Sequence, residues 1–406
     1  MEKTKQSLSV RWLYMVIGVL AMLFAGVLYA WSILKSPLTQ EFGWGQSELA
    51  INFTLAMSFF CIGGLLGAQL SKRAGHTVAL LLSGILSALG FILTASIKNG
   101  SVELLYITYG VLAGLGIGIA YNVVIATVSS WFPDKKGLCS GFLMMGFGAS
   151  ALILGNVADA MFKSAVGWRM TYVILGISIF VVIALAGFLL KAPGLDTGLL
   201  KLETTKASKD KASQQEFTSA QMLRRPSFWM AFICISFLAA VGSSVISFAK
   251  DLALSVKAPE SLAVSLVGVL SVCNGIGRII TGAVFDIIGR RRTMLYANIL
   301  TICAAGVTLI AVNVGSLLLC IVGLCLTGIS YGSCPTITAA FTSSFYGMKH
   351  FPNNMAIMTF TVMAGSLIAT ASNKVLEVTG GYAGAFIMLM VLTFIALVLN
   401  LFIRKP

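Results

Sequence analysis

An arginine in the middle of an apolar segment is the residue of this sequence best suited to do chemistry. Arg278 lies in the run from Ser261 to Ile288, whose only other charged residue is Asp286. Eight residues of helix separate the two, about 12 Å, which predicts that Arg278 lies near the midplane of a bilayer core about 30 Å thick. A central arginine costs roughly 2.5 to 3.5 kcal/mol on insertion scales, so such residues usually line a protein cavity and bind a charged ligand. The alternative is a cation held by the carbonyl oxygens of neighbouring helices.

A polar stripe on the same segment favours the ligand hypothesis. Its members are spaced by three and four residues, which places them on one face of a helix. They are Ser271, Asn274, Arg278 and Thr281. The guanidinium group can grip a carboxylate with two hydrogen bonds, and the asparagine amide can bind a hydroxyl or keto oxygen. The stripe therefore predicts a binding site for an organic anion.

The elements that must position this stripe are membrane spans. The chain is 58% hydrophobic and only 10% charged over 406 residues, whereas about a quarter of a soluble protein is charged. Twelve apolar runs are long enough to cross a bilayer. They cover residues 12–34, 47–70, 77–97, 102–130, 138–158, 170–190, 227–249, 261–288, 294–313, 316–345, 352–373 and 382–403. We expect an all-α membrane protein with twelve transmembrane helices.

The distribution of charge predicts the orientation in the membrane. With the N-terminus inside, twenty of the 28 Lys and Arg residues fall in cytoplasmic segments and seven fall outside, with Arg278 between them. This satisfies the positive-inside rule and places both termini in the cytoplasm. Orientation explains the formal net charge of +14 better than nucleic-acid binding, because the basic residues are scattered over short loops. We expect a protein of the cell membrane, in a bacterial inner membrane.

The sequence also repeats itself at a shift of 214 residues. VSSWF at 128–132 falls on TSSFY at 342–346, Gly114 and Gly118 fall on Gly328 and Gly332, and Gly75 falls on Gly289. A polar stretch at 192–226 separates the two copies and is expected to hold a short amphipathic helix near Ala220. We therefore predict a six-helix bundle at 1–191, a cytoplasmic linker at 192–226 and a second six-helix bundle at 227–406. Such parallel repeats are typical of transporters that alternate access around a midplane site.

GAVFDIIGRRR at 282–292 resembles the signature loop of the major facilitator superfamily. Asp286 can pair with Arg290 across the turn at Gly289, which predicts a gating role for the two residues. The arginine run also has a simpler explanation, since basic residues set topology. The equivalent loop of the first copy departs from the pattern, because Lys72 stands where the acid is expected.

A second resemblance is more specific and covers nearly the whole chain. GLGIGIAYNVVIATVSSWFPDKKGLCSGFLMMGFG at 114–148, LYAWS at 28–32 and QMLRRPSFW at 221–229 are similar to the oxalate/formate antiporter branch of the superfamily, which is related to the monocarboxylate transporters. The resemblance implies the major facilitator fold. It also implies that Arg278 binds the substrate carboxylate. The glycines at 110, 114 and 118 are better explained by helix packing than by ligand contact.

Two departures from the relatives bear on the substrate and the coupling. Oxalate transporters of the branch carry a second cation in span eleven, and no Lys or Arg occurs here between Lys349 and Lys374. One arginine suits one carboxylate, because a second buried carboxylate would lack a partner. Animal monocarboxylate transporters have an aspartate where Asn274 stands, and an asparagine cannot carry a proton. Proton coupling is therefore in doubt, and exchange and facilitated passage stay open.

Further side chains are expected at the site. Polar groups deep in spans one, four and ten can each donate to a carboxylate, although buried tyrosines as often pack or bond to helix carbonyls. They are Tyr29, Tyr121, Asn122 and Tyr331. Phe360 in span eleven is a candidate for the apolar wall, with packing as the alternative.

We therefore expect a secondary transporter of small organic anions, of the pyruvate, lactate or formate type, that works as a monomer in the lipid bilayer. The alternatives are an oxalate/formate-type exchanger, a drug efflux carrier and a membrane anion sensor. The central arginine weighs against the efflux carrier, and the short linker against a sensor with an output domain. No cofactor, metal or nucleic-acid partner is implied, and no constellation of His, Cys, Ser and acidic residues suggests an enzyme.

Overall fold

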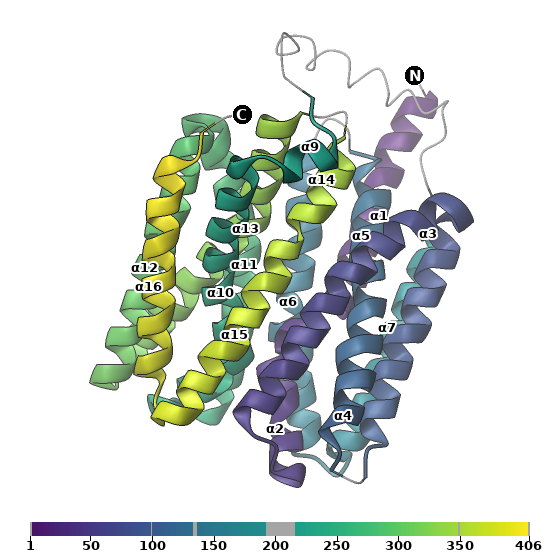
Figure 1. The fold of residues 1–406 in the computed structure, drawn as a ribbon. Coiled ribbons are helices and arrows are strands. Elements are labelled where there is room, and N and C mark those ends of the chain that lie inside the picture. The colour runs from purple at the N-terminus through teal and green to yellow at the C-terminus, as the bar shows by residue number, and fades with distance from the viewer. Residues whose placement is uncertain (1, 99, 133–135, 192–215, 348–349, 405–406) are drawn as a thin grey trace.

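A computed structural model describes residues 2–98, 100–132, 136–191, 216–347 and 350–404. Within these ranges the chain forms helices and no strand. The elements are α1 (Glu2–Ala25), η1 (Gly26–Ala30), α2 (Trp31–Phe42), α3 (Gln46–Ala95), α4 (Val102–Leu105), η2 (Tyr106–Ala113), α5 (Gly114–Ser129), α6 (Lys136–Phe162), α7 (Gly167–Leu189), α9 (Ser219–Leu223), α10 (Pro226–Ser255), α11 (Glu260–Ile288), α12 (Arg290–Val314), α13 (Leu317–Tyr346), α14 (Phe351–Met358), α15 (Phe360–Thr379) and α16 (Tyr382–Phe402). Figure 1 shows them as one bundle of steep, roughly aligned helices.

The predicted spans are confirmed, with one change in how they are divided. Eleven helices of the described chain are long and apolar enough to cross a membrane. The longest, α3, has 50 residues and would be about 75 Å long if straight, more than twice the thickness of a bilayer core. It contains Gly75 at φ 86° and ψ 161°, a conformation open to glycine, and there the chain turns back. Thus α3 supplies two of the twelve predicted crossings.

Several spans are not regular α-helices, and span one is the first of them. It runs through α1, the 3₁₀-helical turn η1 and α2, and η1 carries Tyr29. In span four, η2 has π-helical hydrogen bonding before α5 begins. Span eleven is interrupted at Thr359, between α14 and α15. Departures of this kind are frequent at functional sites, since they redirect side chains without breaking a helix outright.

The 214-residue repeat corresponds to repeated helix contacts. At three pairs of glycines related by this shift, an added Cβ would lie between 2.0 and 2.6 Å from a carbonyl oxygen of the facing helix, too close for any side chain. Each contact in α3 and α5 has its counterpart in α11 and α13 at the same shift. The pairs are Gly63 with Leu115 and Gly277 with Ile329, Gly114 with Ala56 and Gly328 with Leu270, and Gly118 with Phe60 and Gly332 with Asn274. The interpretation of the stripe at 110, 114 and 118 as packing glycines is confirmed for α5 against α3.

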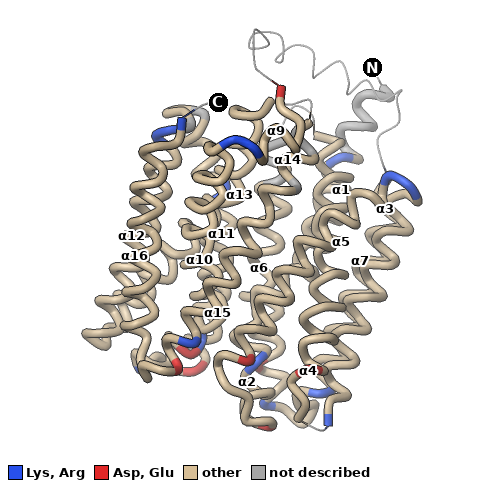
Figure 2. The backbone as a smooth tube through the Cα atoms, viewed as in Figure 1, with Lys and Arg blue, Asp and Glu red and all other residues tan. Residues whose placement is uncertain are grey.

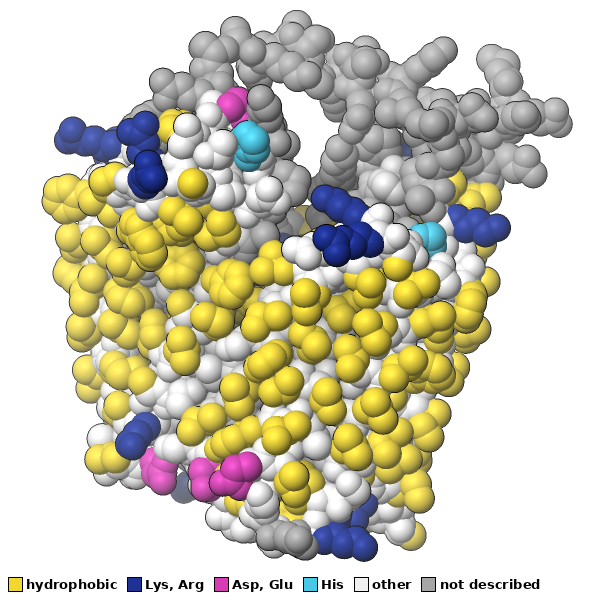
Figure 3. Space-filling view, turned by 45° about the vertical axis from the view of Figure 1, so that its right-hand side comes forward, with side chains coloured by type: hydrophobic (Ala, Val, Ile, Leu, Met, Phe, Trp, Pro, Cys, Tyr) yellow, Lys and Arg dark blue, Asp and Glu magenta, His cyan; other side chains and the backbone are white. Residues whose placement is uncertain are grey.

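We call α1 to α7 the N-terminal helices and α10 to α16 the C-terminal helices. Both termini lie at one end of the bundle, the terminal end, and we call the other the distal end (Figure 1). Most charged residues lie at these two ends (Figure 2), and hydrophobic side chains cover the zone between them on the face seen in Figure 3. This distribution suits a molecule whose middle contacts lipid.

Charged residues from both sets of helices form ion pairs at the distal end. Lys35 of α2 pairs with Asp251 of α10 at 2.8 Å. Lys250 of α10 lies 3.5 Å from Asp159 of α6. Lys163, just after α6, pairs with Asp159 at 2.7 Å and with Glu260 of α11 at 3.2 Å. We call these six residues the distal cluster. The hydrogen bond to Asp159 is the main cause that raises the pKa of Lys163 above its usual value, so this lysine keeps its charge at neutral pH.

The end of the predicted linker packs on the C-terminal helices. The expected short helix near Ala220 is confirmed as α9, where Thr218 and Gln221 form a capping box. The backbone N–H of Phe217 donates to the carbonyl oxygen of Tyr346 at 3.1 Å. Asn354 Nδ2 donates to the carbonyl oxygen of Phe217 at 3.0 Å. Residues 192–215 lie outside the described chain, so the boundaries of the two predicted bundles stay a prediction.

Candidate functional site

Arg278 lies in α11 and is 9% exposed. Its Nε donates a hydrogen bond to Asn274 Oδ1, one turn earlier on the same helix, at 3.2 Å. Its Nη1 donates to the hydroxyl oxygen of Tyr121 in α5 at 3.1 Å and to the sulfur of Met144 in α6 at 2.7 Å. The guanidinium group therefore reaches from the C-terminal helices to two of the N-terminal helices.

No carboxylate among the described residues forms an ion pair with Arg278. Its partners Asn274, Tyr121 and Met144 are all neutral, and Nη2 has no acceptor in the described part of the chain. A buried charge without a counter-ion costs several kcal/mol in typical proteins. The arrangement leaves an unpaired cation with a free donor, which a carboxylate satisfies well.

Close packing fixes the part of α11 that carries the stripe. An added Cβ at Gly332 of α13 would lie 2.0 Å from the carbonyl oxygen of Asn274. One at Gly148 of α6 would lie 2.3 Å from the carbonyl oxygen of Ser271. Small residues at such crossings let backbones approach closely. The stripe is thus packed between α13 of the C-terminal helices and α6 of the N-terminal helices. A movement of the two sets of helices relative to each other would therefore displace it.

An aromatic wall from the N-terminal helices stands beside the guanidinium group. Phe147 of α6 is at its centre, in edge-to-face contact with Tyr29 at 5.0 Å and with Tyr121 at 5.2 Å between ring centroids. Phe60 of α3 contacts Tyr121 in the same way at 5.0 Å. Such rings exclude water and lower the local dielectric constant, which strengthens the attraction between Arg278 and an anion.

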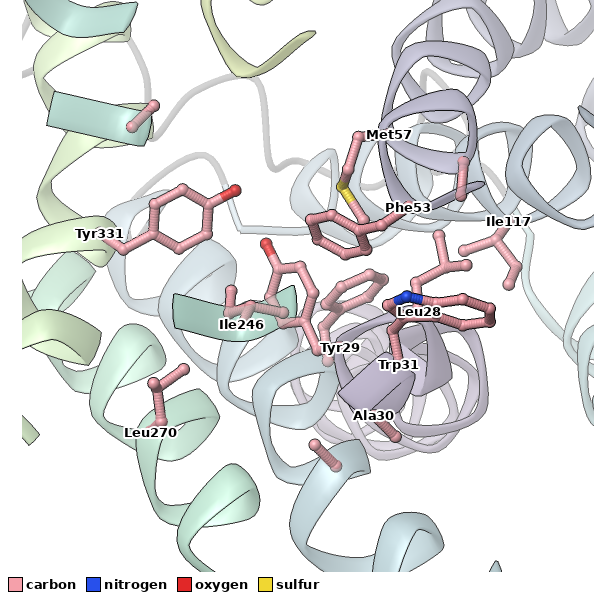
Figure 4. Close-up of a cluster of buried hydrophobic side chains, with 14 of the residues drawn as sticks. Leu28, Tyr29, Ala30, Trp31, Phe53, Met57, Ile117, Ile246, Leu270 and Tyr331 are labelled. Atoms are coloured by element: carbon pink, nitrogen blue, oxygen red, sulfur yellow. The ribbon is translucent and has the colours of Figure 1, made fainter. Parts of the chain in front are cut away.

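Tyr331 of α13 brings the second set of helices to this wall. Its ring centroid lies 6.3 Å from that of Tyr29. Figure 4 shows Tyr331 extending towards Tyr29 and Phe53 across the space between the two sets of helices. Tyr331 Oη accepts a long hydrogen bond of 3.5 Å from Ser243. Both tyrosines are within electrostatic range of Arg278, so the structure gathers Tyr29, Tyr121 and Tyr331 around one cation.

Two buried polar atoms of the stripe have no hydrogen-bond partner. They are Asn274 Nδ2 and Ser271 Oγ, on residues that are 1% and 0% exposed. Buried polar groups are normally satisfied, and each exception calls for an explanation such as a bound water or ligand. Thr281, the last member of the stripe, is satisfied instead, because its hydroxyl lies 2.7 Å from Ser333 Oγ.

The remaining predicted site residues are less closely placed. Asn122 of α5 is half-buried and lies 3.9 Å from the position of a Cβ added at Gly64, and no hydrogen bond joins it to Arg278. Phe360, the first residue of α15, is half-buried, and its ring pairs with no other described ring. The side chains of Asp286 and Arg290 lie outside the described part of the structure, so their gating role stays a prediction.

Three residues at the site were not expected from the sequence: Met144, Phe147 and Phe60. Methionine and phenylalanine are common here, with 17 and 25 copies, and nothing in an apolar span marks the ones that face inward. Their one signal is position, because Met144 and Phe147 belong to the segment at 114–148 that carries the family resemblance. Within the described residues no group of three or more His, Cys, Asp or Glu could hold a metal ion.

Comparisons with known proteins identify the family of this chain. The model of the Major Facilitator Superfamily matches residues 14–370 and, in a second alignment, 232–406. The oxalate:formate antiporter of Oxalobacter formigenes is 27% identical over 97% of this chain and 91% of its own. An uncharacterized MFS-type transporter of Escherichia coli, YhjX, is 27% identical over 88% of this chain and 86% of its own. Monocarboxylate transporter 12-B of Danio rerio is 27% identical over 80% of this chain and 72% of its own.

A solved structure shows the same fold. The xylose transporter XylE from E. coli, in a partially occluded inward open conformation, has a TM-score of 0.72 and covers 98% of this chain and 99% of its own, at 13% identity. Twelve apolar crossings, glycine contacts repeated at a fixed shift and a superfamily match over most of the sequence lead to one assignment. The protein is a multi-pass membrane protein and belongs to the major facilitator superfamily.

Proposed function

We propose that the protein is a secondary transporter of small organic anions, and that Arg278 binds the carboxylate of a monocarboxylate substrate. The observation that carries the proposal is a buried arginine with neutral partners only, at the contact between the two sets of helices. The relatives support it, since they include an oxalate:formate antiporter and monocarboxylate transporters.

The polar groups around Arg278 suggest how a substrate is held. One carboxylate oxygen takes the free Nη2 donor of Arg278, and the hydroxyl of Tyr121 supports the guanidinium group from the other side. Asn274 Nδ2 and Ser271 Oγ, which lack partners, then bind a hydroxyl or keto oxygen next to the carboxylate. The aromatic wall of Tyr29, Phe147 and Phe60 would cover the apolar part of the substrate.

The absence of a second cation favours one carboxylate over two. The part of α15 before Lys374 contains no Lys or Arg, so a second buried carboxylate would lack a partner there. An oxalate/formate-type exchanger remains the second candidate because a relative carries that name. A drug efflux carrier is disfavoured, since a bulky apolar substrate would leave the charge of Arg278 unpaired.

The distal cluster supports alternating access with the site approached from the terminal end. Lys35 with Asp251, and Lys250 with Asp159, close the distal end across the two sets of helices. We place both termini, and therefore the terminal end, in the cytoplasm because the Lys and Arg residues gather there. Asp286 and Arg290 are assigned to gating at the same end.

Counterflow in proteoliposomes tests the proposal. Vesicles loaded with unlabelled lactate, pyruvate, formate or oxalate are diluted into a trace of the labelled anion, with xylose and a lipophilic cation as unrelated solutes. Accumulation of label driven by at least one monocarboxylate is expected. Accumulation driven by the sugar or the cation, with none by any carboxylate, would refute anion transport.

A further inference from the structure

Two hollows open on either side of the last turn of α16, at the terminal end. The first has a volume of about 210 Å³ and lies between the start of α10 and the end of α16. Its lining residues are Arg225, Pro226, Ser227, Met230, Phe402 and Arg404. The second, of about 240 Å³, lies between the start of α12 and the end of α16. Its lining residues are Arg291, Arg292, Leu295, Asn400 and Leu401.

Each hollow contains two arginines and no acidic residue. All four arginines are exposed, and none forms an ion pair with a carboxylate of the described residues. Arg225 stacks over the ring of Phe217 at 5.2 Å, which positions it without neutralising it. Four cations of like sign around one helix end repel one another, and an anion between them relieves that repulsion.

The hollows also lie at the edge of the lipid-facing surface. Leu401 and Phe402, which line one hollow each, and Trp229 near the start of α10 are all more than half exposed. Trp229 Nε1 donates to the carbonyl oxygen of Leu223 at 2.9 Å, and the side chain lies on the surface of the helices. Tryptophan at this depth is typical of the headgroup level of a bilayer. Figure 3 shows Lys and Arg side chains just above the hydrophobic zone on this part of the molecule.

We propose that the two hollows bind the phosphodiester groups of anionic phospholipids. The planar guanidinium group matches two phosphate oxygens at once, so a pair of arginines can enclose one phosphate. The exposed Leu401 and Phe402 lie where the acyl chains of the same lipid would descend. This apolar flank is what selects a lipid over a soluble phosphate, and basic pockets between membrane helices are a known form of headgroup recognition. The site is independent of Arg278 and of the proposed transport.

Native mass spectrometry of the full chain in detergent can measure the binding. The probes are phosphatidylglycerol and the zwitterionic phosphatidylcholine with the same acyl chains. Two double variants each remove two charges from one hollow: Arg225→Gln with Arg404→Gln, and Arg291→Gln with Arg292→Gln. The matched control is Lys72→Gln with Arg73→Gln, which removes two exposed charges from the terminal end of the N-terminal helices. Thermal unfolding without lipid checks that each variant is folded.

The unmodified protein should retain phosphatidylglycerol in preference to phosphatidylcholine. Each hollow variant should lose roughly tenfold or more of that preference at the altered hollow, because two basic residues at the membrane surface are removed. The control should keep it. Equal loss in the control would reduce the effect to net charge and overturn the site. Displacement of the lipid by an equal concentration of glycerol phosphate would overturn it as well, because the ligand would then be a soluble phosphate.

Discussion

Gly118 in the N-terminal helices and Gly332 in the C-terminal helices make the same backbone contact, each with the carbonyl oxygen of a facing residue. That facing residue is Phe60 in the first case and Asn274 in the second. One turn further along, the 214-residue shift pairs Gly64 with Arg278. The two sets of helices thus share a scaffold but differ in the residues that matter for binding. The N-terminal helices supply most of the aromatic rings, and the C-terminal helices supply Tyr331 and the charge.

Removing that charge should have the largest effect on transport. Arg278→Ala is expected to lower transport by about a hundredfold or more, since the loss of a buried charged partner typically costs 2 to 5 kcal/mol. Arg278→Lys should fail as well, because lysine keeps the charge but loses the planar fork. Initial uptake rates, normalised to protein in the membrane, measure both.

Gly64, which the 214-residue shift pairs with Arg278, provides the control for this experiment. Gly64→Ala places a Cβ 3.9 Å from the nearest atoms of the facing helix, an ordinary van der Waals contact, so transport should be retained. Arg73→Ala removes an exposed charge and should also be harmless. Near-normal uptake by Arg278→Ala would contradict the proposed site, and near-normal uptake by Arg278→Lys would reduce Arg278 to a point charge.

The charge of the substrate tests the same difference between the two sets of helices. Arg278, on the C-terminal helices, is the one cation at the proposed site. Monocarboxylates should therefore compete for uptake at least tenfold better than oxalate, a difference of roughly 1.4 kcal/mol or more. Inhibition constants for lactate, pyruvate, formate and oxalate against one labelled substrate give the ratio. If oxalate competes equally well, a second cation reaches the site and the oxalate-type assignment becomes the better one.

The shared scaffold predicts equal damage from matched glycine substitutions. Gly118→Ala would place a Cβ 2.1 Å from the carbonyl oxygen of Phe60, and Gly332→Ala would place one 2.0 Å from that of Asn274. Both substitutions require the backbone to move. Overpacking of this kind typically costs 1 to 3 kcal/mol, so the unfolding temperature of both variants should fall by several degrees.

Transport should then separate the two glycine variants. Gly332→Ala displaces the backbone of Asn274 and Arg278, whereas Gly118→Ala displaces Phe60, so uptake per folded molecule should drop further in the former. Equal uptake by the two variants would mean that the backbone position of Asn274 is not critical.

The smallest effect is expected from pH. Asn274 cannot carry a proton, and the described acids of the spans, such as Glu48, Asp159 and Glu377, lie within a turn of a helix end. Exchange of labelled for unlabelled anion should therefore vary less than about twofold between pH 6 and 8, where the substrate carboxylate and Arg278 both stay charged. Asn274→Asp should weaken binding, because an adjacent carboxylate would neutralise the guanidinium group. Strong acceleration of net uptake by an inward proton gradient in the unmodified protein would show that another group carries a proton.

The spans could be predicted because long apolar runs are easy to recognise. The contact of Arg278 with Asn274 could be predicted because both stand out among apolar residues of one segment. A charge inside an apolar run is conspicuous, and the spacing of Asn274 from Arg278 placed both on one helical face. The contact between Arg278 and Tyr121 was expected only as a possibility within a group of four polar residues. It required knowing that α5 and α11 face each other, which no spacing along one helix reveals.

Other features could not be predicted from local patterns. Met144 and Phe147 look like any apolar residues of a span until α6 is placed against α11. The interruption of span one at η1 could not be predicted from a proline, because η1 contains none. The nearest proline, Pro37, lies in the following helix α2. The distal cluster joins residues more than 200 positions apart, such as Lys35 and Asp251, and so depends on how the two sets of helices meet.

In a carrier that alternates access, such a cluster would make the conformational equilibrium sensitive to temperature. Opening of the distal end would break the ion pairs of the cluster, such as Lys35 with Asp251, and their charged groups would become hydrated. The hydration of charged groups carries a strongly negative entropy and becomes less favourable on warming. Warming should therefore favour the closed distal end, and cooling should release it. A carrier with this cluster would present its substrate site to the two sides of the membrane in proportions that depend on the growth temperature of its host.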